Sequence, residues 1–353
     1  MSSSVLSQMK VLDLSNQRLK DLADVRFATL FPHLRKLVLD GNSSLTEVNF
    51  SLEALQRGFN LIYSAPLQKL VKLCLNGCAR LHPSRLDLGG VPGLETLELS
   101  NMGLTDLSFV PDSLGQQRNL KILRLGKNEF QSIPDGCFAH LKALQFLDMS
   151  QNKLRVIEPD KAFLGLTELR ELHLEENRLP AFGQSDAIQT QGYIVTKNGV
   201  INYFAEDKHG VSPNGSPSRR HTWFRTVRLK VLNLAFNRIQ ELRDVGRISE
   251  LRGLHTVSLV NNPFSRKNWY RYQLINHCPN LRAIDSVPIT QEETERVAAL
   301  VRQHLENNPT AAMAVVTVDA LLEQPGGGLP QNRQQQLQQQ IAEHARQAAG
   351  KRR

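Results

Sequence analysis

The stretch LRELHLEENRL, residues 169–179, decides how the chain folds. Its leucines stand three and then two residues apart, which fits neither the spacing of a helix face nor the strict alternation of a strand. Leu172 and Leu174 alternate like a short strand, and Asn177 follows at a position where the chain can turn. The stretch therefore predicts a short strand that ends in a tight turn.

The same pattern recurs along most of the chain. Its fourth position falls at Leu12, Leu37, Leu73, Leu97, Leu123, Leu147, Leu172, Leu232 and Val257, with steps of 25, 36, 24, 26, 24, 25, 60 and 25 residues. A repeat of this length with the pattern L-x-x-L-x-L-x-x-N/C-x-L is the mark of the leucine-rich repeat. We therefore predict the α/β class: a right-handed leucine-rich-repeat solenoid with a parallel concave sheet, about nine repeats and a capped C-terminus.

The ninth position of the pattern supplies the turn. A polar side chain buried there can hydrogen-bond turn backbone groups that would otherwise be unpaired. We expect a structural turn ladder, less regular in the early coils, where Gln17 and Met102 depart from the pattern. The expected ladder residues are Asn42, Cys78, Asn128, Asn152, Asn177, Asn237 and Asn262.

Composition and motifs argue against several classes of protein. No apolar run approaches the 18 residues of a membrane-spanning helix, and the first residues do not resemble a secretory signal. The chain has no Gly-rich phosphate loop, no G-x-S-x-G and no H-E-x-x-H motif. Cys74 and Cys78 have no second cysteine pair and no histidine cluster beside them. We expect no catalytic residue, no cofactor and no metal site, and we expect reduced thiols in a cytoplasmic protein.

The long steps between repeats indicate the domain organisation. Repeats should occupy residues 1–260, with an insertion at 184–226 in which Asn198-Gly199 predicts a β-hairpin over 193–204. That basic insertion is either a docking arm or a tolerated surface loop. A cap at 261–290 and a helical extension at 291–324, opened by the capping box Thr290 to Glu293, should follow. The linker and Gln-rich basic tail, 325–353, are expected to be disordered.

The segment after the last repeat resembles a known cap. Its Asn262-Pro263, Tyr270-Arg271 and Pro279-Asn280-Leu281 to Ile284-Asp285 are similar to the cap of U2 small nuclear ribonucleoprotein A′ proteins and of the leucine-rich-repeat regulator of protein phosphatase-1. A terminal coil exposes an edge of the core, which a cap must cover. The resemblance implies a structural role for Pro263, Trp269, Tyr270, Tyr272, Leu281 and Asp285.

A second resemblance covers residues 118–295. This half of the chain looks like the C-terminal part of leucine-rich-repeat-containing protein nine, a long repeat protein of ciliated and flagellated organisms. The present chain is shorter and carries the insertion at 184–226. The resemblance implies a scaffold or adaptor associated with a cilium, a flagellum or the cytoskeleton.

The outward residues of the strands are the candidates for binding. Stacked strands leave their third, fifth, seventh and eighth pattern positions free to contact a partner. Phe146 and Phe236 would be exposed aromatic anchors, and the glutamates would suit a basic segment of a partner or of the chain itself. An ordinary solvated face is the alternative. The candidate partner-binding residues are Arg124, Phe146, Asp148, Glu171, His173, Glu175 and Phe236.

These observations predict a non-catalytic scaffold that binds a protein partner. The net charge of +9 keeps open a ribonucleoprotein role of the U2 A′ type, with a nuclear location, and the cap keeps open a phosphatase-regulator role. Positive charge gathers in the insertion and the tail, whereas the middle strands are acidic, so direct binding to nucleic acid is not expected. Neither the partner nor the oligomeric state follows from the sequence.

Overall fold

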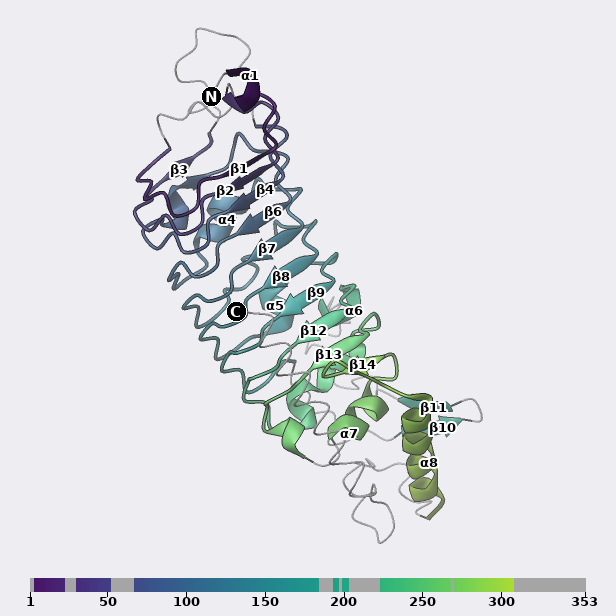
Figure 1. Ribbon diagram of the computed structural model, residues 1–353. Helices are drawn as coiled ribbons and strands as arrows, with labels where there is room; N and C mark the ends of the chain where they lie inside the picture. Colours follow the sequence, from purple (N-terminus) through teal and green to yellow (C-terminus); the bar gives the residue numbers. More distant parts are fainter. Residues whose placement is uncertain are drawn as a thin grey trace, which may run out of the picture. The chain divides into compact units, whose positions relative to one another are not determined.

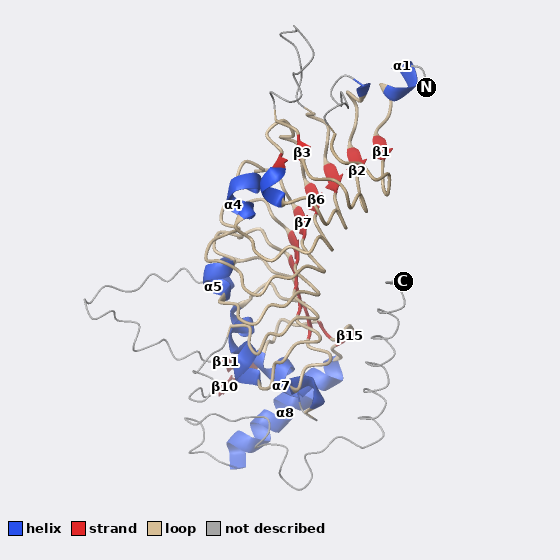
Figure 2. Ribbon diagram, turned by 90° about the vertical axis from the view of Figure 1, so that its left-hand side faces the viewer, coloured by secondary structure: helices blue, strands red, loops and turns tan. Residues whose placement is uncertain are grey.

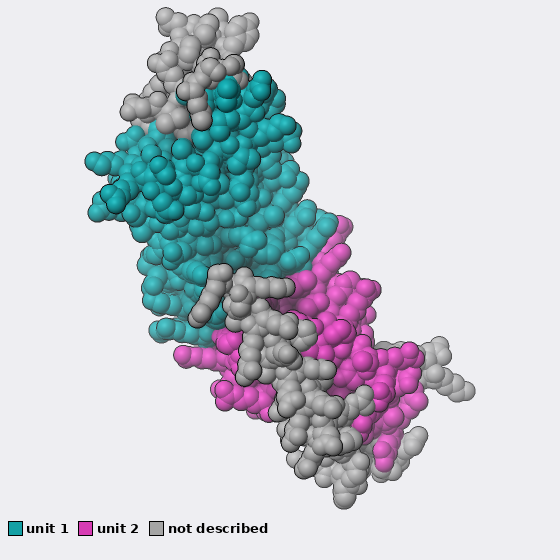
Figure 3. All heavy atoms as spheres, viewed as in Figure 1, with its two compact units in different colours: residues 1–178 teal, residues 179–353 magenta. Residues whose placement is uncertain are grey.

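The computed structural model describes residues 3–22, 30–51, 67–183, 193–196, 199–202, 223–267 and 270–307. The chain forms two compact units, residues 1–178 and 179–353 (Figure 3). Several predicted features lie outside the described residues: Trp269, most of the insertion at 184–226, the extension beyond Asn307, and the linker and tail at 325–353.

Unit 1 begins with helix α1 (Ser3–Leu6) and continues as a stack of coils, each with one three-residue strand on the same side (Figure 1). The strands pair in parallel and in this order: β1 (Val11–Asp13), β2 (Lys36–Val38), β4 (Lys72–Cys74), β6 (Thr96–Glu98), β7 (Ile122–Arg124), β8 (Phe146–Asp148) and β9 (Glu171–His173). The register places Leu123 beside Leu147 and Leu147 beside Leu172, as the repeat predicts.

The other side of the unit 1 coils is irregular. Strands β3 (Val48–Asn49) and β5 (Leu86–Asp87) form a second, two-stranded parallel sheet. The short helices η1 (Pro83–Arg85), α4 (Phe109–Leu114) and α5 (Pro159–Ala162) complete the return segments, and Figure 2 shows α4 and α5 to one side of the row of strands. Leucines of the strands and fully buried phenylalanines such as Phe130, Phe138 and Phe163 fill the core.

Unit 2 contains two further coils and their cap. Its elements are β10 (Tyr193–Thr196), β11 (Gly199–Asn202), α6 (Trp223–Thr226), β12 (Val231–Asn233), η3 (Leu242–Glu250), β13 (Thr256–Ser258), η4 (Phe264–Arg266), α7 (Tyr270–His277), β14 (Ala283–Ile284), β15 (Val287–Pro288) and α8 (Gln291–Asn307). Strands β12, β13 and β14 pair in parallel, and β15 pairs antiparallel with β14. The described part of the chain thus contains the strands of all nine predicted repeats.

The insertion differs from the prediction at one end. Strands β10 and β11 pair antiparallel, as the predicted hairpin requires, but Gly199 pairs with Thr196 and belongs to β11 rather than to the turn. Trp223 and Phe224, however, are buried and pack edge-to-face with Phe182 at centroid distances of 6.3 and 5.9 Å. Because these aromatic rings belong to the core of unit 2, residues 223–226 are the return segment of a coil and not the end of an insertion.

The predicted turn ladder is present in both units. Asn128 accepts from the backbone N–H groups of Met102 and Leu104 at 3.0 and 3.1 Å, and donates to the carbonyls of Leu99 and Leu125 at 2.9 Å each. Each ladder asparagine therefore ties its own turn to the preceding coil. Cys78 contributes a weaker bond from Sγ to the carbonyl of Leu39. The early coils keep the parallel register, but the ladder is less regular there, as expected: the exposed Gln17 side chain donates to Ser15 of its own turn, and Met102 offers no amide.

The end of unit 2 shows how a stack of coils is closed. In earlier coils, the N–H at the sixth pattern position donates to the backbone carbonyl at the fifth position of the next coil, as Leu234 does to Ser258. Leu259 has no regular coil after it and donates instead to the Asp285 carboxylate at 2.7 Å, with Val260 doing the same at 3.1 Å. The Tyr270 hydroxyl donates to the other carboxylate oxygen. Asp285 therefore replaces the missing coil.

The rest of the cap is held by one buried cation. Arg271 donates to Glu293 at 2.9 and 3.1 Å and to the carbonyls of Ile284 and Pro288 at 3.2 and 2.7 Å. It thereby joins α7, the β14–β15 hairpin and α8. Glu293 also forms the predicted capping box with Thr290 at the start of α8. Of the predicted cap residues, Tyr270, Tyr272, Leu281 and Asp285 are buried and Pro263 is exposed.

Candidate functional site

The candidate site is the strand face, which we define as the side chains at the third, fifth, seventh and eighth pattern positions of each coil. The leucines at the fourth and sixth positions, such as Leu172 and Leu174, point into the core and are fully buried. Because side chains of a strand alternate between its two sides, the third and fifth positions point away from that core. From β4 to β9, most of these outward side chains are half-buried.

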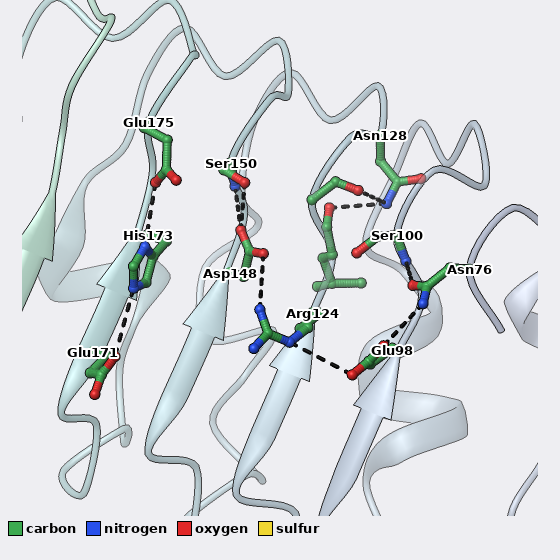
Figure 4. A network of polar contacts seen from close by, with 12 residues as sticks. Asn76, Glu98, Ser100, Arg124, Asn128, Asp148, Ser150, Glu171, His173 and Glu175 are labelled. Carbon is green, nitrogen blue, oxygen red and sulfur yellow. Dashed lines mark hydrogen bonds and ion pairs between the residues drawn. The ribbon is translucent and has the colours of Figure 1, made fainter. Parts of the chain in front are cut away.

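Charges of opposite sign alternate across the strand face of unit 1 (Figure 4). Glu98 lies 2.5 Å from Lys72 and 3.8 Å from Arg124, whose guanidinium is 3.7 Å from Asp148. Asp148 also accepts from the backbone and the hydroxyl of Ser150 at 2.9 and 2.6 Å. Burial raises the pKa of Glu98, but its bonds to Lys72 and Asn76 outweigh that effect and lower it. These side chains hold one another in fixed positions.

Phe146 lies within this network and is not the freely exposed aromatic that we predicted. The Arg124 guanidinium lies over its ring, 4.6 Å from the centroid. The ring of His173, on the neighbouring strand β9, has its centroid 5.0 Å from that of Phe146. The Phe146 ring is consequently half-buried, because Arg124 on β7 and His173 on β9, both in register with Asp148, lean back against it. Its position remains on the strand face, held by a cation and a second ring.

His173 lies between two carboxylates of its own coil. Its Nδ1 is 3.5 Å from Glu175 and its Nε2 is 3.8 Å from Glu171. Burial lowers the pKa of His173, but Glu175, Asp148 and Glu171 together outweigh burial, so that the pKa is raised above its ordinary value. The charged form of the imidazole is therefore favoured on this face.

Glu175 is buried, with 4% of its surface exposed, and this corrects the prediction that it contacts a partner. The seventh position lies where the strand ends, and the carboxylate of Glu175 folds toward His173 instead of projecting outward. The next residue, Glu176, is exposed and accepts a hydrogen bond from Gln151 at 2.9 Å. Glu176 therefore takes the place that we expected for Glu175.

The eighth position has a backbone feature that sequence reasoning missed. In every coil its residue has a positive φ. Where a regular coil of the same unit follows, its N–H donates to the seventh-position carbonyl of that coil, as Lys127 does to Ser150 and Phe236 does to Val260. Asparagine or glycine, which tolerate this conformation, occupy five of the positions, and this enrichment was the available signal. The nine residues are Asn16, Gly41, Gly77, Asn101, Lys127, Gln151, Glu176, Phe236 and Asn261.

The strand face of unit 2 has a different chemistry. Its residues on β12, β13 and the turns after them carry no charge: Val231, Asn233, Ala235, Phe236, Thr256, Ser258, Val260 and Asn261. Phe236 is 48% exposed and Asn261 is also exposed, whereas the other side chains of this face are half-buried or buried. Of the predicted partner-binding residues, Phe236 belongs to unit 2 and the other six belong to unit 1.

The described residues also include four buried cysteines. The described residues contain no group of three or more histidine, cysteine, aspartate or glutamate side chains that could hold a metal ion. Burial raises the pKa of Cys74 to about 12 and that of Cys78 to about 11, so both thiols stay protonated. Cys74 is buried although it occupies a fifth position, which points away from the core. Within the described residues no helix has the length and apolar character needed to span a bilayer.

Comparisons with known proteins agree with the repeat. Two family models, both described as leucine-rich repeat, match residues 118–179 and 225–314. Trophoblast glycoprotein of Macaca fascicularis is 32% identical over 189 residues, which cover 53% of this chain and 40% of that protein, so the chain spans less than half of this relative. U2 small nuclear ribonucleoprotein A′ of Schizosaccharomyces pombe is 25% identical over 194 residues, covering 54% of this chain and 72% of that protein.

Similar solved structures include internalin C2 of Listeria monocytogenes, at 18% identity and a TM-score of 0.46, covering 74% of this chain and 84% of that one. The complex of TLR13 with ssRNA13 gives 22% identity and a TM-score of 0.45, covering 80% of this chain and 37% of that one. The repeat period, the strand register and the two matched stretches lead to one conclusion. The chain belongs to the leucine-rich-repeat proteins, whose domains generally bind other proteins and are typically non-catalytic.

Proposed function

We propose that this protein is a non-catalytic scaffold that binds a protein partner through the strand face of unit 1. The observation that carries the proposal is the row of half-exposed side chains from Lys72 to His173, whose positions are fixed by contacts with one another. Side chains that are already ordered lose less conformational entropy when a partner binds. A row of this kind favours recognition of an extended surface over chemistry on a small molecule.

The charges on this face suggest the class of partner. Glu171 and Glu176 expose carboxylates at the β9 end, and the buried Glu175 adds negative charge behind them. Phe146 offers a ring beside them that already accepts one cation, Arg124. A basic, extended segment of a partner complements this arrangement, since its cations would meet carboxylates and an aromatic ring. The basic residues 351–353 of the chain itself, which lie outside the described residues, are a second source of such a segment.

The test compares two double variants of the full chain. Phe146→Ala combined with Glu176→Ala removes the ring and the exposed carboxylate from the strand face. Leu164→Ala combined with Glu158→Ala removes an exposed apolar and an exposed acidic side chain from the return side, as the matched control. Partners captured by the tagged wild type are identified by mass spectrometry, and their dissociation constants are then measured with purified proteins.

We expect the strand-face variant to weaken the main interaction about tenfold or more, because central aromatic residues carry much of the energy of an interface. The return-side control should bind like the wild type. An unchanged dissociation constant for the strand-face variant, with the same melting temperature as the control, would remove the basis for this proposal.

A ribonucleoprotein role is the second candidate. It is supported by the similarity to the U2 small nuclear ribonucleoprotein A′ and by the net charge of +9. Direct contact with RNA would make the logarithm of the binding constant fall linearly with the logarithm of salt concentration. A salt titration of binding to generic RNA therefore separates the two candidates. RNA binding with a steep slope supports the ribonucleoprotein role, and negligible RNA binding at low salt contradicts direct contact.

The association with a cilium, flagellum or the cytoskeleton remains a prediction from the resemblance in the second half of the chain, and so does a phosphatase-regulator role. Proximity labelling in cells, with flagellar and nuclear marker proteins scored together, tests these locations. Enrichment of flagellar markers supports the first, and enrichment of nuclear markers alone supports the ribonucleoprotein alternative.

A further inference from the structure

Phe236 is a bulky apolar residue in an unfavourable backbone conformation. Its φ is +56°, in the left-handed region that L-residues with large side chains rarely adopt. The conformation is imposed by the coil, since the Phe236 N–H must donate to the carbonyl of Val260 at 2.7 Å. The ring does not compensate by entering the core, because 48% of the residue is exposed. Neither folding nor packing therefore accounts for a phenylalanine at this position.

The chain itself shows which residue the coil prefers. The next coil of the same unit has Asn261 at the equivalent position with a φ of +57°, and Asn16 and Asn101 occupy it in unit 1. Asparagine tolerates this region, whereas phenylalanine costs free energy there. An exposed side chain retained in a strained conformation is a reason to look for a role in binding.

The surroundings of Phe236 define what can bind to it. Ala235 and Val260 are its neighbours along the turn and across to the next coil, and Asn233 and Ser258 occupy the fifth positions of the two strands. Asn233 accepts from the backbone of Ala235 at 3.1 Å, so its carbonyl oxygen is engaged locally. The first charged residues along the coil are the exposed Lys230 and Arg238, on either side of this uncharged centre. An aromatic centre without charge and a charged rim are the features of a binding hot spot.

Phe236 also differs from Phe146 in how its ring is used. Phe146 is covered by Arg124 and stands beside His173, so its ring already has partners within the chain. Among the described residues, no ring and no cation stacks on Phe236. A cationic segment could stack on the Phe236 ring, but it would contact no carboxylate on the strand face of unit 2. By charge complementarity, this face fits an uncharged segment and the face of unit 1 fits a basic one.

We propose that the strand face of unit 2, centred on Phe236, is a second protein-docking surface, and that it binds an extended, uncharged segment of another protein which lays an apolar side chain on the Phe236 ring. This surface goes beyond the function proposed for unit 1, because it uses other residues and selects a partner of different chemistry. The chain thus offers two surfaces, one for a basic segment and one for an apolar segment.

The experiment selects ligands directly from a large pool of peptides, so the natural partner need not be identified first. A random peptide library displayed on phage is panned against the immobilised full chain, and Phe236-dependent peptides are isolated by counter-selection against the full-length Phe236→Asn variant. This substitution introduces a residue that the chain itself uses at the same position, so the variant should melt at or above the wild-type temperature. The Phe146→Ala, Glu176→Ala double variant serves as the second control, because it alters only the face of unit 1.

We expect Phe236-dependent peptides with an apolar anchor and no net charge. Their dissociation constants should rise about tenfold or more when Phe236 is replaced by Asn. The constants should change little with salt concentration or in the Phe146→Ala, Glu176→Ala double variant. Failure to recover any Phe236-dependent peptide would overturn the proposal, as would recovery of basic peptides whose binding falls with salt. Concentration-dependent self-association of the wild type that Phe236→Asn abolishes would also overturn it, by assigning this face to a second copy of the chain.

Discussion

Unit 1 and unit 2 build the same coil and put different chemistry on its strand face. In both, the fourth and sixth positions are buried, the ninth-position asparagine ties a turn to the preceding coil, and the eighth residue has a positive φ. In unit 1 the outward positions carry alternating charges joined from Lys72 to Asp148. In unit 2 they carry none. The repeating positions therefore determine the fold, and the non-repeating positions are free to determine what binds.

The largest effect is expected where the two units differ in structure, at the cap of unit 2. Arg271→Ala should lower the free energy of unfolding by about 3–5 kcal/mol, because it leaves the half-buried Glu293 and several carbonyls without their donor. Urea unfolding followed by circular dichroism measures the loss. Arg302→Ala, at an exposed position of α8, is the control and should change stability by less than about 0.5 kcal/mol. A similar loss for both variants would show that Arg271 does not hold the cap.

The turn ladder should behave alike in both units, because its geometry is the same. Asn128→Ala in unit 1 and Asn262→Ala in unit 2 each remove a side chain that bonds at least two carbonyls and at least one N–H of the turns. Each should cost about 3 kcal/mol, since buried backbone groups are left unsatisfied. Gln17→Ala, at the same pattern position but with an exposed side chain, should cost almost nothing. Thermal melts of the three variants provide the comparison, and a loss confined to one unit would argue against a shared ladder.

Phe236→Asn should have a smaller effect of the opposite sign. Relief of the left-handed phenylalanine is expected to raise the free energy of unfolding by about 1 kcal/mol. Phe146→Asn, at a third position with ordinary strand geometry, should instead lower it, because contacts with Arg124 and His173 are lost. Equilibrium unfolding in urea measures both. A destabilised Phe236→Asn variant would mean that the ring contributes packing which outweighs its strain.

The smallest expected effect is a dependence of stability on pH. It should come from the strand face of unit 1, which carries titratable side chains, and not from that of unit 2. The pKa of His173 is raised in the folded chain, so its charged form stabilises unit 1. That stabilisation is fully present below the unfolded value of about 6.5 and is lost as pH rises through the higher folded value. His173→Gln should therefore lower stability at pH 6 more than at pH 9, as measured by urea unfolding at each pH. An equal loss at both values would contradict a charged His173, and the strand face of unit 2 should show no such dependence.

Much of this architecture could be predicted from the repeat alone. The positions of Leu123, Leu147 and Leu172, the ladder asparagines and the capping box at Thr290 all follow from spacing, because each is repeated or has a local motif. The site was harder to predict. The pattern marks the position of Glu175 as outward, but burial there depends on His173 in the same coil. The register that places Arg124 over Phe146 is likewise a contact between coils, which no single repeat contains.

Hydroxyl-radical footprinting of the full chain, alone and with its purified partner, tests directly whether partners bind the strand faces. The method reports the exposure of single side chains, and the chain offers exposed apolar residues on both sides of its coils. We expect a bound partner to protect Phe146 or Phe236 on the strand faces and to leave Val156 and Leu164, on the return side, oxidised as before. Protection of Val156 and Leu164 with unchanged oxidation of both phenylalanines would contradict it.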